Sequence, residues 1–187
     1  MMGWRISRVT AVVCLLSLCA AVSVTARSGQ LEMIGVPEDV LAGQYDSQTK
    51  VFRADLTEIP DAFVRIVYNG TVIEGRVVEW NTEDDYLKVQ QGASVVRKDM
   101  RLTGELVEYF RADELLTAAD DVRVMQEDTT ITADSFSFFE PEERAEFRGN
   151  VVVEFSEGVF RGGHLVLYVE DDRMEFLGPF SGEFRSE

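Results

Sequence analysis

The feature that most constrains this chain is an internal repeat with a period of 29 residues. Three copies align over 25 positions without a gap, and an earlier copy matches for about its first half before slipping near Gly92. The copies begin at Ile73, Leu102, Ile131 and Phe160. Such a unit buries its apolar face only by stacking on its neighbours, so residues 73–187 predict one continuous repeat-built domain. Residues 27–72 fit the register poorly and are predicted to hold degenerate copies or a cap.

The second half of each repeat is predicted to be a β-strand. From Ala145 to Phe155 every odd-numbered residue is apolar or glycine, and the residues between them are mostly polar. Side chains of a strand alternate between its two faces, so this pattern predicts one buried and one solvated face. The equivalent positions of the neighbouring repeats are apolar too: Leu116, Ala118, Val122 and Val124 before it, and Met174, Phe176, Phe180 and Phe184 after it.

In the first strand of each repeat the alternation of apolar and polar side chains shifts by one residue at a fixed place, which is a change of parity. Ile131 and Ala133 lie on one face, whereas Phe136 and Phe138 carry the apolar face further along, shifted by one residue. The two neighbouring repeats show the same change. A recurrent shift of this kind predicts a bulge at which the strand turns a corner between two sheets.

Short polar connections are predicted between these strands. Charged turns at residues 112–114, 141–143 and 170–172 join the two strands of a repeat, and 127–129 and 156–158 join successive repeats. Asn69 and Gly70 are predicted to form a hairpin turn. Three aspartate pairs lack the ordered ligands and the glycine bend of a calcium loop and are predicted to be solvated turns. These pairs are Asp84 and Asp85, Asp120 and Asp121, and Asp171 and Asp172.

The N-terminus has the pattern of an export signal. Arg5 and Arg8 precede the apolar run of residues 9–18, and Val24-Thr25-Ala26 supplies the small residues of a cleavage site, so residues 1–26 are predicted to be removed after Ala26. The alternative is a retained inner-membrane anchor, because residues 9–26 carry no charge and about 18 residues are near the lower limit for a span. Both cysteines lie in this segment, so the mature chain would contain no disulfide and no cysteine metal site.

The charge of the chain excludes one class of partner. The formal net charge is −16, and cleavage would remove two positive charges to leave −18. A chain this acidic is repelled by phosphate backbones, so it is not predicted to bind nucleic acid. Two readings of the acidity stay open: a soluble exterior for a protein with exposed sheet edges, or binding of divalent cations or a cationic partner.

No residue pattern in the sequence predicts catalysis. His164 is the only histidine, and without a second histidine or a cysteine in the mature chain it is predicted to be structural or on the surface. No phosphate-binding glycine loop, nucleophile elbow or CxxC motif occurs. The sequence therefore predicts no enzyme, no cofactor and no metal site.

Three segments of the repeats carry recognisable motifs: residues 131–136 read ITADSF, residues 147–153 read FRGNVVV, and residues 160–168 read FRGGHLVLY. These motifs resemble those of the OstA-like family of lipopolysaccharide-transport proteins. The resemblance covers roughly residues 100–187 and weakens back to 73. It implies an all-β fold, a slightly open antiparallel β-jellyroll with about two strands per repeat over residues 27–187. It also implies that such jellyrolls join end to end by β-augmentation, with one another or as a self-oligomer.

The resemblance implies a function as well. In this family acyl chains lie in the apolar interior, and the protein bridges the periplasm as lipopolysaccharide moves to the outer membrane. A membrane-anchored relative of the same pathway corresponds to the alternative of an uncleaved N-terminus. The predicted lipid-lining residues are Leu116, Ala118, Val122, Val124, Phe147, Val151, Val153, Phe155, Phe176 and Phe180.

Two further hypotheses stay open at the level of sequence. The first is a structural β-solenoid that binds protein or polysaccharide in the envelope without carrying lipid, and a period of 29 also suits one coil of a parallel β-helix. The second is an ordinary packed core, in which the predicted lining residues contact only one another. The two strands per repeat and the parity change favour the jellyroll.

Overall fold

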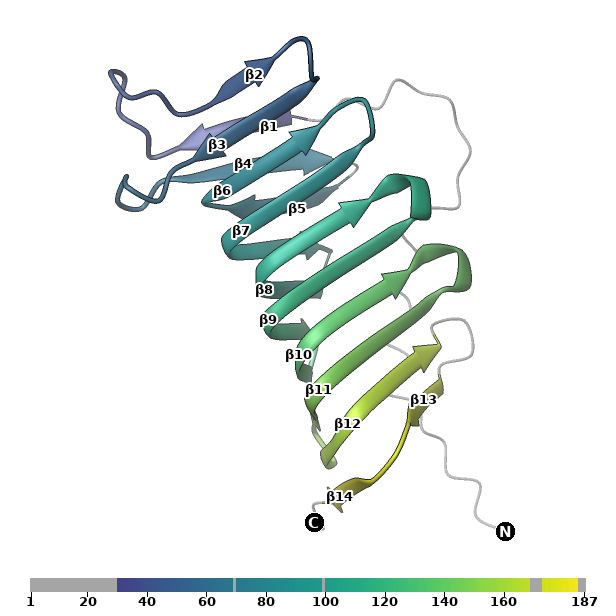
Figure 1. The fold of residues 1–187 in the computed structure, drawn as a ribbon. Coiled ribbons are helices and arrows are strands. Elements are labelled where there is room, and N and C mark those ends of the chain that lie inside the picture. Colours follow the sequence, from purple (N-terminus) through teal and green to yellow (C-terminus); the bar gives the residue numbers. More distant parts are fainter. Residues whose placement is uncertain (1–29, 69, 99, 169–172, 185–187) are drawn as a thin grey trace.

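The computed structural model describes residues 30–68, 70–98, 100–168 and 173–184, and these form a single 14-stranded sheet folded over on itself (Figure 1). Every pairing between the strands is antiparallel. The predicted antiparallel β-jellyroll is therefore confirmed, and the parallel β-helix is ruled out because its coils would pair in parallel.

Six long strands carry the repeats, and each one bends. Their bounds are β7 (Tyr86–Arg97), β8 (Met100–Phe110), β9 (Leu115–Gln126), β10 (Thr129–Phe139), β11 (Arg144–Phe155) and β12 (Gly158–Tyr168). The pairing register shifts in the middle of each neighbouring pair, for example between Arg148 and Val151 and between Ala133 and Ser135. These shifts are β-bulges, which bend a strand and increase its twist. The corner predicted from the parity change is confirmed.

The bends divide the sheet into two layers that meet at the corner. Layer 1 contains β2 (Gln44–Asp46), β3 (Val51–Asp55), β6 (Val77–Asn81), the halves of the long strands next to their charged turns, and β13 (Arg173–Phe176). Layer 2 contains β1 (Gln30–Ile34), β4 (Phe63–Tyr68), β5 (Thr71–Gly75), the other halves, and β14 (Phe180–Phe184). Opposite the corner the two layers end in separate rows of turns, and we call this side the mouth.

The N-terminal segment continues both layers as shortened copies of the repeat. Each of its bent units is split at the corner: β5 and β6 are separated by Arg76, and β3 and β4 by residues 56–62. The Arg76 side chain donates hydrogen bonds to the carbonyl oxygens of Leu56, Thr57 and Ile59 at 2.8–3.0 Å. This clamp closes the corner where a continuous bent strand is missing. The split strands before β7 are therefore degenerate copies of the repeat.

Where the structure describes them, the turns that join the strands match the sequence expectations with one exception. The 3₁₀ turns η1 (Arg111–Asp113) and η2 (Glu140–Glu142) join β8 to β9 and β10 to β11. The exception is Asp120 and Asp121, which lie inside β9 with φ angles of 59° and 54°. They form the bulge of that strand, where aspartate tolerates the left-handed conformation better than most residues. Asp171 and Asp172 lie outside the described residues, as does Asn69 of the predicted hairpin between β4 and β5.

The corner of β11 is built from glycine, asparagine and aspartate. Gly149 has a φ of 75° and Asn150 a φ of 47°. The Asn150 side-chain amide donates to both carboxylate oxygens of Asp134 on β10, at 2.9 and 3.1 Å. A Cβ atom at Gly149 would lie 2.1 Å from the Asp134 carboxylate, so only glycine fits beside this hydrogen bond.

Gly149→Ala is expected to lower the free energy of unfolding by about 1–2 kcal/mol, the usual cost of a left-handed conformation for a residue with a Cβ. Urea unfolding followed by circular dichroism measures the change. Gly163→Ala is the control, because a Cβ there meets nothing within 4 Å and the backbone is in an ordinary strand conformation. Equal losses for both variants would contradict this account of the corner.

The core lies between the two layers and follows the alternation of the repeats. Phe138, Ala145 and Val153 have no exposed surface, and Phe136 packs on Phe147 with ring centroids 5.0 Å apart. Burying a side chain of this size contributes about 1.5–3 kcal/mol. The repeated apolar face is therefore the main stabilising feature of the fold.

Candidate functional site

All ten residues predicted to line a lipid groove lie on the inward faces of the two layers. Seven of them are buried in the core, with exposed fractions of 6% or less, and they are Leu116, Ala118, Val122, Val124, Phe147, Val151 and Val153. Phe155 and Phe176 are partly buried against this core. Phe180 is 58% exposed. The interior is thus packed by its own side chains through most of its length and uncovered at the C-terminal end.

Five phenylalanines gather where the interior is uncovered, and we call them the phenylalanine cluster: Phe155, Phe160, Phe176, Phe180 and Phe184. Phe176 of layer 1 stacks on Phe180 of layer 2 with centroids 5.1 Å apart and planes 13° apart. Phe160 contacts three of the others at 5.4–5.8 Å. The cluster therefore joins the inner faces of both layers.

The far side of the phenylalanine cluster is open. Phe180 and Phe184 are 58% and 62% exposed, and the neighbouring Leu177 is 49% exposed. β13 and β14 are the last strands of the two layers in the described part of the chain, so no further strand covers these rings there. Such a concentration of exposed aromatic surface at one end of a core is typical of an interaction site. Sequence alternation identified Phe176, Phe180 and Phe184 as inward-facing. That Phe160 belongs to the same cluster is seen only from its ring contacts in the structure.

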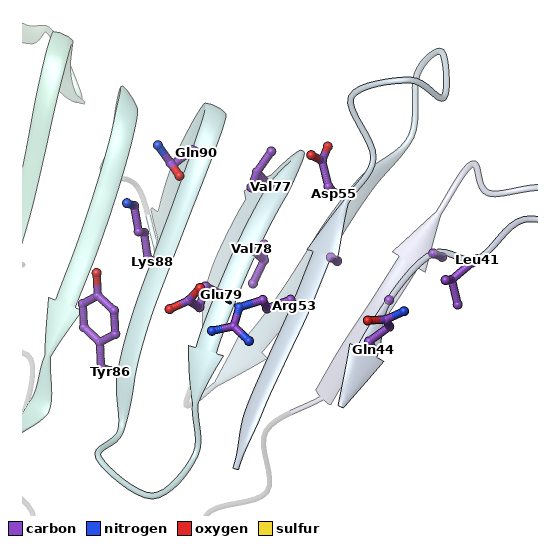
Figure 2. A pocket seen from close by; sticks show the side chains of 13 residues that line it. Leu41, Gln44, Arg53, Asp55, Val77, Val78, Glu79, Tyr86, Lys88 and Gln90 are labelled. Carbon is purple, nitrogen blue, oxygen red and sulfur yellow. Dashed lines mark hydrogen bonds and ion pairs between the residues drawn. The ribbon is translucent and has the colours of Figure 1, made fainter. Parts of the chain in front are cut away.

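The opposite end also exposes apolar side chains, but the hollow beside them lies on an outer face. Val40, Leu41 and Tyr45 are 41%, 72% and 55% exposed. A hollow of about 500 Å³ lies beside them over β3, β6 and β7 (Figure 2). Its lining is mostly polar and includes the Arg53–Glu79 ion pair at 2.8 Å. This chemistry does not suit acyl chains, and the hollow is separate from the interior.

A polar cluster lies at the mouth, halfway along the molecule. Glu140 is the first residue of η2, and its Oε1 atom is buried. Burial is the main cause that raises the pKa of Glu140, Glu114 adds to it, and Arg97 and Tyr109 oppose it. The alternation pattern did not single out any of these residues, because they lie at strand ends and in turns.

The raised pKa of Glu140 gives a testable pH dependence. A carboxyl group with a higher pKa in the folded than in the unfolded state stabilises the fold at low pH, and this contribution is lost as the pH rises from about 4.5 through the folded-state value. The side chain of Glu140→Gln resembles the neutral acid, so this variant is not expected to lose stability as position 140 would otherwise ionise. Above pH 6 it should therefore unfold at a higher urea concentration than the native chain. Parallel stability curves for the native chain and the variant between pH 4 and pH 8 would contradict the assignment.

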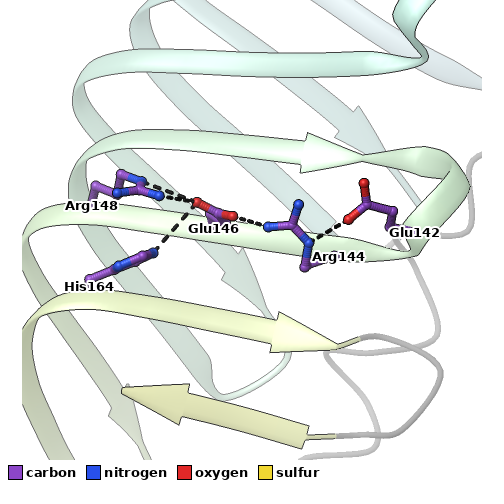
Figure 3. A network of polar contacts seen from close by, with 5 residues as sticks. All are labelled: Glu142, Arg144, Glu146, Arg148 and His164. Carbon is purple, nitrogen blue, oxygen red and sulfur yellow. Dashed lines mark hydrogen bonds and ion pairs between the residues drawn. The ribbon is translucent and has the colours of Figure 1, made fainter. Parts of the chain in front are cut away.

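The outer face of layer 1 carries a second polar network, on β11 and β12 (Figure 3). Glu146 forms ion pairs with Arg144 and Arg148, and its carboxylate lies 3.5 Å from Nε2 of His164. Burial, and then the charge of Arg148, lowers the pKa of His164, so the contact with Glu146 is not an ion pair at neutral pH. His164 faces away from the interior and lies over a salt-bridged surface, which agrees with its predicted structural or surface character.

The described residues contain no group of three or more histidine, cysteine, aspartate or glutamate side chains that could hold a metal ion. No helix in the described part of the chain is long and apolar enough to cross a membrane. The predicted leader, residues 1–26, lies outside that part.

Comparison with known proteins bears on the fold. No family model and no curated protein matches the sequence. Among solved structures, the chain is similar to LptH of Pseudomonas aeruginosa, described as the LptA homologous periplasmic component of the conserved lipopolysaccharide transport device. The match has a TM-score of 0.55 at 12% identity, and it covers 62% of this chain and 95% of that one. The chain therefore has the LptA-like fold of the OstA type.

Proposed function

We propose that this protein is a periplasmic carrier that binds the acyl chains of lipopolysaccharide, or of a related lipid, and passes them towards the outer membrane. The observation that carries the proposal is the phenylalanine cluster, an inward-facing apolar surface that the fold leaves uncovered at its C-terminal end. The LptA-like fold supports the same function, because LptH is a component of a lipopolysaccharide transport device.

Acyl chains gain free energy by burial against such a surface, at about 0.8 kcal/mol for each methylene group removed from water. The exposed faces of Phe180 and Phe184 offer the first contacts. Deeper binding requires the two layers to separate at the mouth, because Val151, Phe147 and their neighbours fill the interior. The layers are joined through the strands at the corner and end in separate turns at the mouth, so they can part there without breaking the sheet.

The ends of the molecule suit assembly by strand addition. β13 and β14 at one end and β1 and β2 at the other are edge strands of the described sheet, and both ends expose apolar side chains. An edge strand can pair with a strand of another chain through main-chain hydrogen bonds. We propose that the partner is another OstA-like jellyroll or a second copy, which would extend the interior from one molecule to the next.

Export to the periplasm is part of the proposal. Cleavage after Ala26 would release the jellyroll, and retention of residues 1–26 would hold it at the inner membrane. Mass determination of the protein isolated from the envelope distinguishes the two forms. A chain that begins at Arg27 supports the soluble carrier, and a chain that keeps the leader supports the anchored form.

Lipid analysis tests the proposed function. The protein is purified from its native envelope without detergent and examined by native mass spectrometry, and a fluorescent fatty acid is then bound to delipidated protein. We expect an acylated lipid to copurify and lipopolysaccharide to displace the probe. A protein that carries no lipid and binds no probe would instead be a structural envelope domain that contacts protein or polysaccharide.

A further inference from the structure

A continuous row of large side chains crosses the outer face of layer 1 near the mouth, and we call it the outer row. Its members face one another in the strand register from β7 to β12, and the rings of Tyr86 and Phe110 have centroids 5.1 Å apart. Each member is next in sequence to a side chain that belongs to the core or packs against it, so the outer row points away from the interior. The outer row consists of Tyr86, Phe110, Leu115, Phe139, Arg144 and Tyr168.

Two aromatic rings of the outer row carry a guanidinium group. The guanidinium carbon of Arg144 lies 4.3 Å from the centroid of the Phe139 ring, and that of Arg173 lies 4.2 Å from the centroid of the Tyr168 ring. The two pairs occupy equivalent positions of the 29-residue repeat. The outer row therefore combines flat apolar surfaces with planar groups that donate hydrogen bonds.

Polar groups border the outer row on both sides. Towards the mouth lie the charged turns at residues 111–114 and 140–143. The apolar strip between these borders is one residue wide, and its six strands span roughly 24 Å at about 4.8 Å between neighbours. On the other side, two residues further from the mouth, the strand register aligns Lys88, Glu108, Thr117, Ser137 and Glu146.

The shape of this strip fits a linear glycan. A sugar ring has apolar C–H groups on its faces and hydroxyl groups along its edges, so a glycan chain is a narrow ribbon with the same arrangement as the strip. Aromatic rings can pack on the C–H faces, and the bordering polar side chains can bond to hydroxyl groups, which both donate and accept. A folded partner protein needs a broader surface, about 800 Å² on each side of a standard interface.

The hollow on the outer face lies at the β7 end of the outer row and shares Tyr86 with it (Figure 2). The Tyr86 hydroxyl donates to Glu108 at 2.6 Å, which fixes the ring at the edge of the hollow. Lys88 and the Arg53–Glu79 ion pair line the same space. The hollow therefore surrounds about 500 Å³ with both donors and acceptors, next to an aromatic ring.

We propose that the outer row and the hollow bind a linear glycan that carries few anionic groups. Its sugar rings stack on Tyr86, Phe110 and Phe139, and its hydroxyl groups bond to the polar side chains beside them. The acidic side chains of the turns at 111–114 and 140–143 repel phosphate and uronate groups, so charge selects against heavily anionic chains. The site lies on the face opposite the interior, so it does not depend on acyl-chain binding.

Two glycans of the bacterial envelope have this chemistry, and this choice of sources rests on the proposed periplasmic location. The first is the polysaccharide released from lipopolysaccharide by mild acid. The second is chitohexaose, an uncharged analogue of the cell-wall backbone. Each is titrated into the native chain in a calorimeter. We expect at least one of them to bind, and the one that binds identifies the source of the glycan, whereas binding of neither overturns the proposal.

Phe110→Leu and Phe139→Leu are each expected to weaken glycan binding about threefold to tenfold, because leucine keeps an apolar side chain but has no flat ring. Phe63→Leu is the matched control. Phe63 points outward beside the buried Val64, and the guanidinium carbon of Arg65 lies 5.5 Å from its ring centroid, but it belongs to layer 2. Its substitution should leave the affinity unchanged. No loss in the first two variants, or an equal loss in all three, overturns the placement of the site.

The chain has only three lysines, which allows a footprint that needs no variant. Lys88 lines the hollow, whereas Lys98 is exposed in the turn after the layer 2 half of β7. The rate of acetylation at each lysine is measured by mass spectrometry with and without a saturating amount of the glycan that binds. We expect the glycan to slow acetylation of Lys88 and not of Lys98. An unchanged rate at Lys88 overturns the site.

The same protein shows whether this site and the proposed carrier function fail separately. A chain that binds a fluorescent fatty acid but neither glycan keeps the carrier function and loses the glycan site. A chain that binds a glycan at Lys88 but no fatty acid keeps the glycan site and loses the carrier function.

Discussion

Val151→Asp is expected to prevent the domain from folding stably at room temperature. Val151 is 1% exposed, faces the interior from β11 and pairs with Gly162 of β12, where no cationic side chain can meet a carboxylate. An unpaired buried charge costs several kcal/mol, and a domain of this kind has only about 5–15 kcal/mol of stability in total. Loss of the cooperative urea transition in circular dichroism measures the effect.

The neighbouring residue provides the matched control. Val152 points outward on the same strand and pairs with Arg161 and Thr132. Val152→Asp is therefore expected to cost about 1 kcal/mol or less, the range of strand propensity. If both variants unfolded alike, the assignment of inward and outward faces in β11 would be wrong. The result also means that a charge at Val151 reports on folding, so it cannot serve as a test of lipid binding.

Phe180→Ser combined with Phe184→Ser is expected to weaken fatty-acid binding about tenfold to a hundredfold. Phe180 and Phe184 each expose more than half of their surface. Removing either ring is expected to cost roughly 1 kcal/mol or more of apolar contact with an acyl chain. The free energy of unfolding should fall by about 1–3 kcal/mol, because the stacking of Phe180 on Phe176 and the edge contact of Phe184 with Phe160 are lost, while the fold is kept. Fluorescence titration with a labelled fatty acid and urea unfolding measure the two quantities.

The control for this pair lies at the opposite end. Val40→Ser and Leu41→Ser remove apolar side chains that are 41% and 72% exposed but belong to a loop outside the interior. They are expected to leave the affinity unchanged. An equal loss of affinity from both double variants would indicate nonspecific adsorption to apolar surface.

The sequence predicted the parts of the fold that repeat. Alternation placed Phe147, Val151 and Val153 on one face, and the parity change between Ala133 and Phe136 located the corner that the bulge in β10 forms. Both signals are local, since side-chain direction along a strand follows from the chain itself. The aspartates of β9 were misassigned as a turn because a bulge and a turn favour the same residues.

Other features depend on how distant segments meet. Val151 and Phe180 have the same inward orientation, yet one is buried and the other exposed, because only the arrangement of the last strands decides what covers them. Arg97 and Glu140 are far apart in the sequence and lie at strand ends in different layers, so no periodic pattern links them. The N-terminal copies were obscured because short strands and the Arg76 clamp replace the continuous bent strand.

Photocrosslinking in the native envelope tests most directly whether the uncovered interior holds lipid. A photoreactive amino acid is placed at Phe180 or at the adjacent Ser181, which lie on opposite faces of β14 and are both exposed. We predict that irradiation attaches an acylated lipid at position 180 and not at position 181. Equal labelling at the two positions, or no lipid at position 180, would contradict the account.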